Sequence, residues 1–281
     1  MDGGDQLLVL GATSLVGRRL LPRLAAMGAP VSALSREPHP DDGVRWVRGS
    51  LADPALQLPR AGLVFSLMPL WLLPQALPRL AAGGMKRLVA FSSTSRFTKL
   101  DSPEPSERAV AQALAEAEAQ TIAGCEAAGV AWTLLRPTLI YSEGEDRNVS
   151  RLAALIGRFG VLPLAGRGEG RRQPVHADDL AEGAIAAAAA PAAHDQAYDL
   201  PGGETLSYRA MTVRIFEALG RQPRIVSIPP AVWGLGLRLA SPVLPGATAA
   251  MGARMSEDLV FDPGPAARDF GWAPRAFRPR F

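Results

Sequence analysis

The sequence predicts an α/β fold, a doubly wound parallel sheet with a smaller C-terminal substrate lobe. Two observations carry this prediction. Short apolar runs alternate with helix-forming stretches through the first half of the chain. The runs are apolar at successive positions, which is typical of parallel strands that are buried on both faces. In addition, the first run ends in a glycine-containing turn that opens a helix. Sheets of this class bind ligands at the carboxyl ends of their strands.

The first half of the chain contains six expected strands and three expected helices. The strands are Leu7–Leu10, Val31–Leu34, Val44–Val47, Leu63–Leu67, Leu88–Phe91 and Trp132–Leu135, and the helices are Val16–Met27, Leu72–Ala82 and the alanine-rich Ser106–Ala128. Further helices are expected at Val149–Phe159, Asp178–Ala190 and Ser207–Leu219. We therefore expect residues 1–141 to form a nucleotide-binding core. Residues 142–281 add the remaining sheet elements and the smaller lobe, and the two parts form one interwoven unit.

Composition excludes several classes of protein. The net charge of +3 is small and the basic residues are scattered, so nucleic-acid binding is not expected. No run reaches the roughly 18 apolar residues of a membrane span. The longest apolar stretch, 231–251, is interrupted by Arg238 and two prolines; it is interpreted as lobe structure, with an interfacial membrane helix as the alternative. Cys125 is the only cysteine, which rules out disulfides within the chain and cysteine zinc sites, and favours a cytoplasmic protein. No metal site is expected.

The turn after the first strand has the pattern of a dinucleotide-binding turn. It reads Gly11-Ala-Thr13-Ser14-Leu15-Val-Gly17. The first glycine permits the tight turn, the last allows close packing of the helix, and the helix amides then face a pyrophosphate. A serine occupies the position where glycine is usual, so its side chain must point away from the phosphates or donate its hydroxyl to one of their oxygens. The alternative is an ordinary strand–turn–helix without a ligand.

Residues at the ends of later strands indicate which dinucleotide is bound. Ser35 and Arg36 follow the second strand, and a hydroxyl beside a guanidinium suits a 2′-phosphate, so NADP is favoured. Glu37 keeps NAD possible. Ser50 and Leu51 are expected beside the adenine. The cofactor contacts that we expect further along are Leu67 and Ser92.

Several motifs in order make the chain resemble the extended short-chain dehydrogenase/reductase family, the group of NAD-dependent epimerases and dehydratases. They are GATSLVG, FSSTS at 91–95, LLRPTLIYS at 134–142, RQPVHADDLA at 172–181 and DFGWAP at 269–274. The resemblance implies a Rossmann sheet, a small-molecule substrate that includes nucleotide sugars as candidates, and a possible homodimer. It also implies a Ser/Thr, a tyrosine and a lysine as the catalytic set, the last two spaced Tyr-x-x-x-Lys on the long helix.

This chain departs from the family pattern at the catalytic pair. The resemblance places the Ser/Thr at Thr94 and a family glutamate at Glu118, so the lysine position falls on Leu114 and the tyrosine position on Val110. Neither aliphatic side chain exchanges a proton. None of the chain's three tyrosines is followed by a lysine four residues later. We therefore expect a member that lacks the usual proton-transfer pair.

Other groups are candidates for the substrate site. Arg172 matches a family arginine that contacts the substrate's diphosphate, with a surface salt bridge as the alternative. Tyr141 and Lys99 are candidates for a substitute acid, and Tyr141 also for substrate binding. His176 is expected to order its loop. Glu118 and its neighbour Glu116 are expected to be solvated or to cap the helix.

The functional prediction has two forms. The first is an NAD(P)-binding protein of the nucleotide-sugar epimerase/dehydratase lineage, an oxidoreductase that acts on a nucleotide sugar or a small carbonyl compound without the usual tyrosine and lysine. This form remains possible because the cofactor itself carries the hydride chemistry. The second is a non-catalytic protein that senses NADP(H) or docks on a partner.

Overall fold

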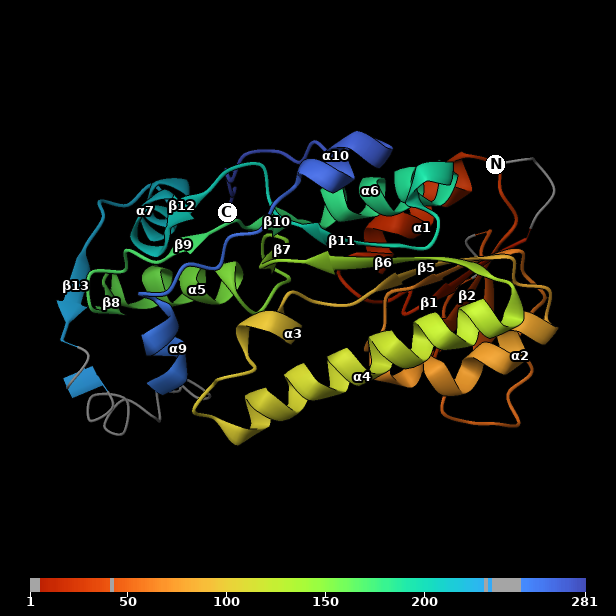
Figure 1. The fold of residues 1–281 in the computed structure, drawn as a ribbon. Coiled ribbons are helices and arrows are strands. Elements are labelled where there is room, and N and C mark those ends of the chain that lie inside the picture. Colours follow the sequence, from red (N-terminus) through yellow and green to blue (C-terminus); the bar gives the residue numbers. More distant parts are fainter. Residues whose placement is uncertain (1–5, 41–42, 230–231, 234–248) are drawn as a thin grey trace.

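The central element is a seven-stranded sheet in which every pair of neighbours is parallel. The computed structural model describes residues 6–40, 43–229, 232–233 and 249–281. The strand order is β11-β6-β5-β4-β1-β2-β3 (Figure 1). The strands are β1 (Leu7–Leu10), β2 (Val31–Ser35), β3 (Arg45–Arg48), β4 (Leu63–Ser66), β5 (Arg87–Phe91), β6 (Ala131–Pro137) and β11 (Gln196–Leu200). The expected fold class and all six strands of the first half are confirmed.

Helices cover both faces of the sheet, as the apolar strands require. One face packs against α1 (Gly17–Ala26), α6 (Ala177–Ala189) and α10 (Gly264–Phe270). The other packs against α2 (Leu77–Ala82) and α4 (Pro105–Ala128). In Figure 1 these two layers lie above and below the sheet. Neighbouring residues of β1 show the alternation, since Leu8 packs into the α2/α4 layer and Val9 into the α1/α6 layer.

The stretch expected to be one helix over 72–82 is divided. It forms two short 3₁₀ turns, η1 (Leu70–Leu72) and η2 (Pro74–Ala76), and only then the helix α2. Pro74 and Pro78 agree with this division, because a proline lacks an N–H donor and fits best in the first turn of a helix. Each proline lies at the first or second position of its short element. A short helix that was not expected, α3 (Ser95–Thr98), follows β5.

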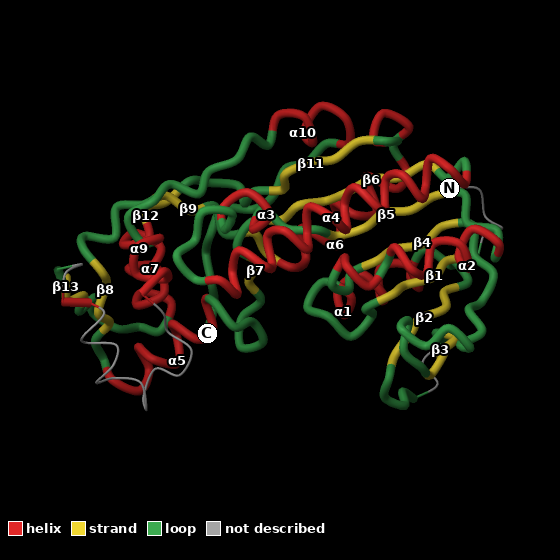
Figure 2. Tube along the Cα trace, turned by 60° about the horizontal axis from the view of Figure 1, so that its bottom comes forward, coloured by secondary structure: helices red, strands yellow, loops and turns green. Residues whose placement is uncertain are grey.

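The second half of the chain builds a lobe at one end of the sheet (Figures 1 and 2). Its helices are α5 (Val149–Phe159), α7 (Tyr208–Ala218) and α9 (Ala249–Arg254). Short strand pairs join them: β7 (Ile140–Tyr141) with β10 (Val175–His176), β9 (Arg171–Arg172) with β12 (Leu206–Ser207), and β8 (Leu162–Ala165) with β13 (Ile225–Ile228). A third apolar cluster fills the lobe. The same half also returns β11 and α6 to the sheet.

The apolar stretch over 231–251 lies largely outside the described residues, so its interpretation as lobe structure stays a prediction. Within the described part of the chain, no helix has the length and hydropathy needed to cross a bilayer.

Candidate functional site

The turn after β1 requires both of its glycines. Gly11 has φ = +76°, and a Cβ there would lie 2.8 Å from the carbonyl carbon of Leu67. A Cβ on Gly17 would lie 2.5 Å from the carbonyl oxygens of Gly11 and Ala12. The first glycine therefore allows the turn to cross β4 closely, and the second lets α1 begin directly against the turn.

Ser14 occupies the position where glycine is usual, and its side chain is directed toward the start of α1. Its Oγ accepts a hydrogen bond from the N–H of Gly17 at 3.1 Å, and its own N–H donates to the carbonyl oxygen of Gly11 at 3.0 Å. The N–H groups of Leu15 and Val16 have no acceptor among the described residues. Free amides at the start of a helix are what a pyrophosphate needs, so the turn fits a dinucleotide.

The end of β2 presents one cation. The Oγ of Ser35 accepts from the N–H of Glu37 at 3.1 Å and lies 2.9 Å from Nε2 of His39, so this hydroxyl orders its own turn. Arg36 is exposed, and no described carboxylate lies within 4.0 Å of it. The guanidinium is therefore available to an anion.

The other expected cofactor residues differ in exposure. Thr13 and Ser50 are exposed, and Leu15 is half-buried. Leu51 and Leu67 are buried in the two main clusters that flank the sheet.

The end of β5 carries three hydroxyls in a row. Ser92 donates to Oε1 of Glu118 at 2.5 Å, and Ser93 accepts from the N–H of Ser95 at 3.1 Å. The hydroxyl of Thr94 donates to the carbonyl oxygen of Pro137 at 3.1 Å. Thr94 is buried at the start of α3, yet it borders the cavity described below.

The sequence led us to expect a solvated or capping side chain at Glu118. In the structure this residue is instead buried, with 1% of its surface exposed. Arg136 donates to it from Nε at 3.0 Å and from Nη2 at 2.7 Å, and Arg96 forms a second ion pair. Burial raises the pKa of Glu118, but the hydrogen bonds from Arg136 and Ser92 outweigh it and the pKa is lowered overall. The carboxylate therefore stays charged and fastens α4 to β6 and α3. Glu116 is exposed, as expected.

Leu114 and Val110 occupy the positions where the family resemblance places the catalytic lysine and tyrosine. They lie on the same side of α4 as Glu118, one and two turns before it. Leu114 is buried in the cluster beneath the sheet, and Val110 packs partly against that cluster. Both side chains serve packing.

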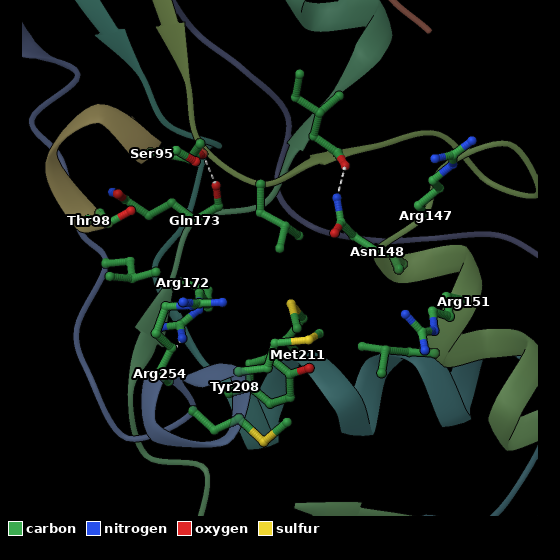
Figure 3. Close-up of a pocket in the computed structure, with 18 of the residues that line it drawn as sticks. Ser95, Thr98, Arg147, Asn148, Arg151, Arg172, Gln173, Tyr208, Met211 and Arg254 are labelled. Carbon is green, nitrogen blue, oxygen red and sulfur yellow. Dashed lines mark hydrogen bonds between the residues drawn. The ribbon is translucent and has the colours of Figure 1, made fainter. Parts of the chain in front are cut away.

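A cavity of about 890 Å³ lies between the cofactor turn and the lobe (Figure 3). Leu15 and Arg18, from the turn and the start of α1, form one part of its wall, together with Ser93 and Thr94. Much of the remainder comes from the loop before α5 and from α5, α7 and α9, with further side chains from α3, β7, β8 and β9. Lys99 also lines the cavity and forms an ion pair with Glu107 at 3.4 Å.

Arg172 lines the cavity, and it does not form the surface salt bridge that was the alternative interpretation. It is 5% exposed and donates from Nη1 to the carbonyl oxygens of Arg171 and Glu257, each at 2.7 Å, and from Nη2 to that of Arg254. No described carboxylate lies within 4.0 Å of it, and burial lowers its pKa. The residue thus holds the end of α9 in place and brings an unpaired positive charge to the cavity.

Tyr141 does not line the cavity. Its ring is 1% exposed and packs edge-on against His176 and Phe277, and burial raises the pKa of its phenol. His176 accepts from the N–H of Asp178 at 3.1 Å and contacts Glu143 at 3.0 Å, so it orders the start of α6 as expected. A tyrosine in this position is a core side chain, and we draw no catalytic role from it.

No group of three or more histidine, cysteine, aspartate or glutamate side chains suited to a metal ion occurs in the part of the chain that the structure describes.

Comparison with known proteins agrees with this geometry. Residues 74–200 match the family model described as NAD dependent epimerase/dehydratase family. The chain is 27% identical to a 2-alkyl-3-oxoalkanoate reductase of Stenotrophomonas maltophilia, over 96% of this chain and 95% of the other. It is 28% identical to an NAD(P)H azoreductase of Xenophilus azovorans, over 79% and 77%.

A solved structure shares the fold. MoeE5 in complex with UDP-glucuronic acid and NAD superimposes with a TM-score of 0.73, at 21% identity over 98% of this chain and 95% of the other. The family model covers the chain from η2 to β11, which includes β5, α4, β6 and α6. Residues 74–200 are thus similar to the NAD dependent epimerase/dehydratase family, and the fold of the chain is that of the solved structure over 98% of its length.

Proposed function

We propose that this protein is an NAD(P)-dependent reductase of a small carbonyl compound, which it binds in the cavity between the sheet and the lobe. One observation carries the proposal: the cavity wall includes both the end of the dinucleotide turn, at Leu15 and Arg18, and the end of β5, at Thr94. A ligand there lies beside the dinucleotide site at the carboxyl ends of the strands. Two curated relatives with reductase names support the direction of the reaction.

The residues suited to the cofactor are those of the turn and of the end of β2. The free amides of Leu15 and Val16 would face the pyrophosphate. Arg36 supports NADP over NAD, because an exposed guanidinium without a carboxylate partner suits a 2′-phosphate. When bound, the nicotinamide supplies a hydride to the carbonyl carbon of the substrate. The chain's own residues orient the substrate and exclude water.

The proton that completes the reduction has to reach the carbonyl oxygen without a tyrosine on α4. Thr94 is one of several hydroxyl side chains that line the cavity, and its hydroxyl donates a hydrogen bond to the carbonyl oxygen of Pro137. We assign Thr94 the role of holding the substrate oxygen: its hydroxyl would turn from the carbonyl of Pro137, which keeps the N–H of Thr94 as a donor at 3.2 Å, and would donate to the substrate oxygen instead. Solvent is the source of the proton. Lys99 lies in the same wall as an electrostatic partner for the oxygen as negative charge develops there.

The test begins with binding. Titration of the purified protein with NADPH and NADH, followed by cofactor fluorescence, is expected to show NADPH binding in the micromolar range. Binding of neither cofactor below about 1 mM would overturn the proposal. Hydride transfer is then screened with ketones, oxoacids and nucleotide sugars.

The matched variants are Thr94→Ala and Thr94→Ser. The alanine variant is expected to lose about 10²-fold or more in kcat/KM, and the serine variant to retain most of it. Cofactor binding without turnover across the panel would instead favour a protein that senses NADP(H).

A further inference from the structure

The lobe side of the cavity includes a group of apolar side chains. Three side chains of α5, Val149, Leu152 and Leu155, face it, and Met211 of α7 lies opposite them. Figure 3 shows Met211 in the middle of the view, between the two groups of arginines. Unbranched thioether side chains adapt their shape to an apolar ligand of variable outline. A volume of about 890 Å³ has room for a ligand well beyond a small ketone.

The same cavity carries an excess of positive charge. The cationic side chains that line it are Arg18, Lys99, Arg147, Arg151, Arg172 and Arg254, and Glu145 is the only carboxylate among the described lining residues. In Figure 3, Arg172 and Arg254 lie on one side of the cavity and Arg147 and Arg151 on the other. The ion pairs of Lys99 and Arg254 both go to Glu107, and Arg18 pairs with Glu145 at 3.6 Å.

Arg172 contributes most to this excess, because it is buried without a carboxylate. A guanidinium removed from water is costly unless an anion lies near it. Its Nη1 and Nη2 groups already donate to three carbonyl oxygens, so it is poorly suited to a bidentate hydrogen-bond contact with a diphosphate. Its charge still acts through the low-dielectric cavity on a single negative group.

We propose that the ligand of this cavity is a carboxylate with a long aliphatic tail, its head near Arg172 and its tail along α5 and α7. This inference rests on the proposed function and names the substrate class of that same site. The reacting carbonyl of such a substrate then lies on the Thr94 side of the cavity, between the carboxylate and the cofactor turn. A nucleotide sugar, whose base, ribose and hexose are polar, does not match the apolar wall.

The test is calorimetric titration of the whole protein with four probes: octanoate, dodecanoate, dodecan-1-ol and UDP-glucose, all below the concentrations at which the amphiphiles aggregate. Dodecanoate is expected to bind at least about tenfold more tightly than octanoate, because each buried CH₂ contributes about fourfold. It is also expected to bind at least about tenfold more tightly than dodecan-1-ol, because the alcohol lacks the charge. UDP-glucose is expected not to bind below about 1 mM.

Two variants on one helix locate the site. Leu152→Asp places a carboxylate in the apolar wall and is expected to weaken dodecanoate binding at least about tenfold. Ala154→Asp adds the same charge at an exposed position of α5 outside the cavity and is expected to leave binding within twofold. Equal loss in both variants, equal affinity for dodecanoate and dodecan-1-ol, or tighter binding of UDP-glucose would each overturn the inference.

An NADPH titration of the wild type and both variants separates the two proposals. If NADPH binds and dodecanoate does not, the substrate class is wrong and the cofactor site remains. If NADPH binds to none of them, the proposed function itself fails, whatever the amphiphiles do.

Discussion

At the scale of single residues, Ser14 shows how the turn tolerates a departure from glycine. Its hydroxyl oxygen caps the first amide of α1, which is the usual role of a serine at a helix start. The side chain is thereby held away from the free amides of Leu15 and Val16. Helix capping and the proposed nucleotide binding would thus use neighbouring atoms of the same turn.

Ser14→Ala is expected to lower the free energy of unfolding by about 1 kcal/mol, since the amide of Gly17 loses its acceptor. For a chain of this size the melting temperature should fall by about 2–4 °C. NADPH affinity should change by less than about threefold. Thermal unfolding and cofactor titration measure the two effects separately, with Thr13→Ala as the control in the same turn. A large loss of affinity without a change in stability would show that the hydroxyl contacts the phosphates instead.

Arg36 determines the choice of cofactor in our proposal. Arg36→Ala is expected to weaken NADPH binding about tenfold or more and to leave NADH binding within about twofold, because only NADPH carries the 2′-phosphate. Parallel titrations at low and moderate salt check this, and the NADPH effect should shrink as salt rises. Preference of the wild type for NADH would contradict the assignment.

At the scale of elements, α4 is held to the sheet by a buried charge rather than by apolar packing alone. Glu118 joins it to Arg136 on β6 and to Arg96 on α3. Removal of the Glu118 carboxylate would leave Arg96 without a carboxylate within 4.0 Å among the described residues, and Arg136 with only its contact to Asp199 at 3.7 Å. The helix that carries the catalytic pair in the family is therefore anchored in this chain one turn beyond Leu114.

Glu118→Gln is expected to destabilise the protein by about 3–5 kcal/mol, because Arg96 loses its counter-charge and Arg136 keeps only the longer contact to Asp199 at 3.7 Å. Glu116→Gln, two residues earlier and exposed, should change stability by less than about 0.5 kcal/mol. Urea unfolding of both variants measures the difference. Similar small effects in the two variants would mean that the ion pairs of Glu118 make no net contribution to the free energy of unfolding.

A second ion pair joins α4 to the lobe. Arg254 at the end of α9 contacts Glu107 in the first turn of α4, and Lys99 adds a further contact. Burial raises the pKa of Glu107, but hydrogen bonds from Arg254 and Ser102 dominate and lower it from 4.5 to about 2. A depressed carboxyl pKa stabilises the folded state above the unfolded pKa, and this stabilisation is lost as the pH falls toward the folded pKa.

The stability difference between the wild type and Glu107→Gln should therefore depend on pH. It is expected to be about 1–2 kcal/mol and constant above about pH 5, and to vanish as the pH falls from about 4.5 to about 2. Urea unfolding at pH 7, 5 and 3 measures it. Glu126→Gln, at an exposed position near the other end of α4, is the control and should show no such loss. A difference that stays constant down to pH 3 would contradict the assignment of the shift to Glu107.

At the scale of the whole molecule, the sheet was predictable from sequence and the substrate site was not. Runs such as Leu7–Leu10 reveal a buried parallel strand because each strand is apolar on both faces. The burial of Glu118 and the main-chain partners of Arg172 depend on residues 18 to 85 positions away, and no local pattern encodes such distances. The division of 72–82 was readable in principle from its two prolines.

The cavity shows the same limit. Its apolar wall comes from α5, α7 and α9, three helices that look like ordinary amphipathic elements in the sequence. Only their assembly reveals which faces point inward at a common space. The motif residues predicted the dinucleotide turn and included Arg172, whereas the proposed substrate class also rests on apolar side chains of α5 and α7 that belong to no motif.

The return of β11 and α6 to the sheet has a consequence for engineering. A chain cut after residue 141 would leave β6 as an open edge and strip the apolar layer that Leu180 and Ala184 provide. Arg87 would also lose the carbonyl of Ala187 that it binds at 2.9 Å. We expect such a fragment to unfold without cooperativity, as circular dichroism during heating would show. We therefore expect that the lobe cannot be transplanted as a module, and that substrate preference is better changed by residue exchange within it.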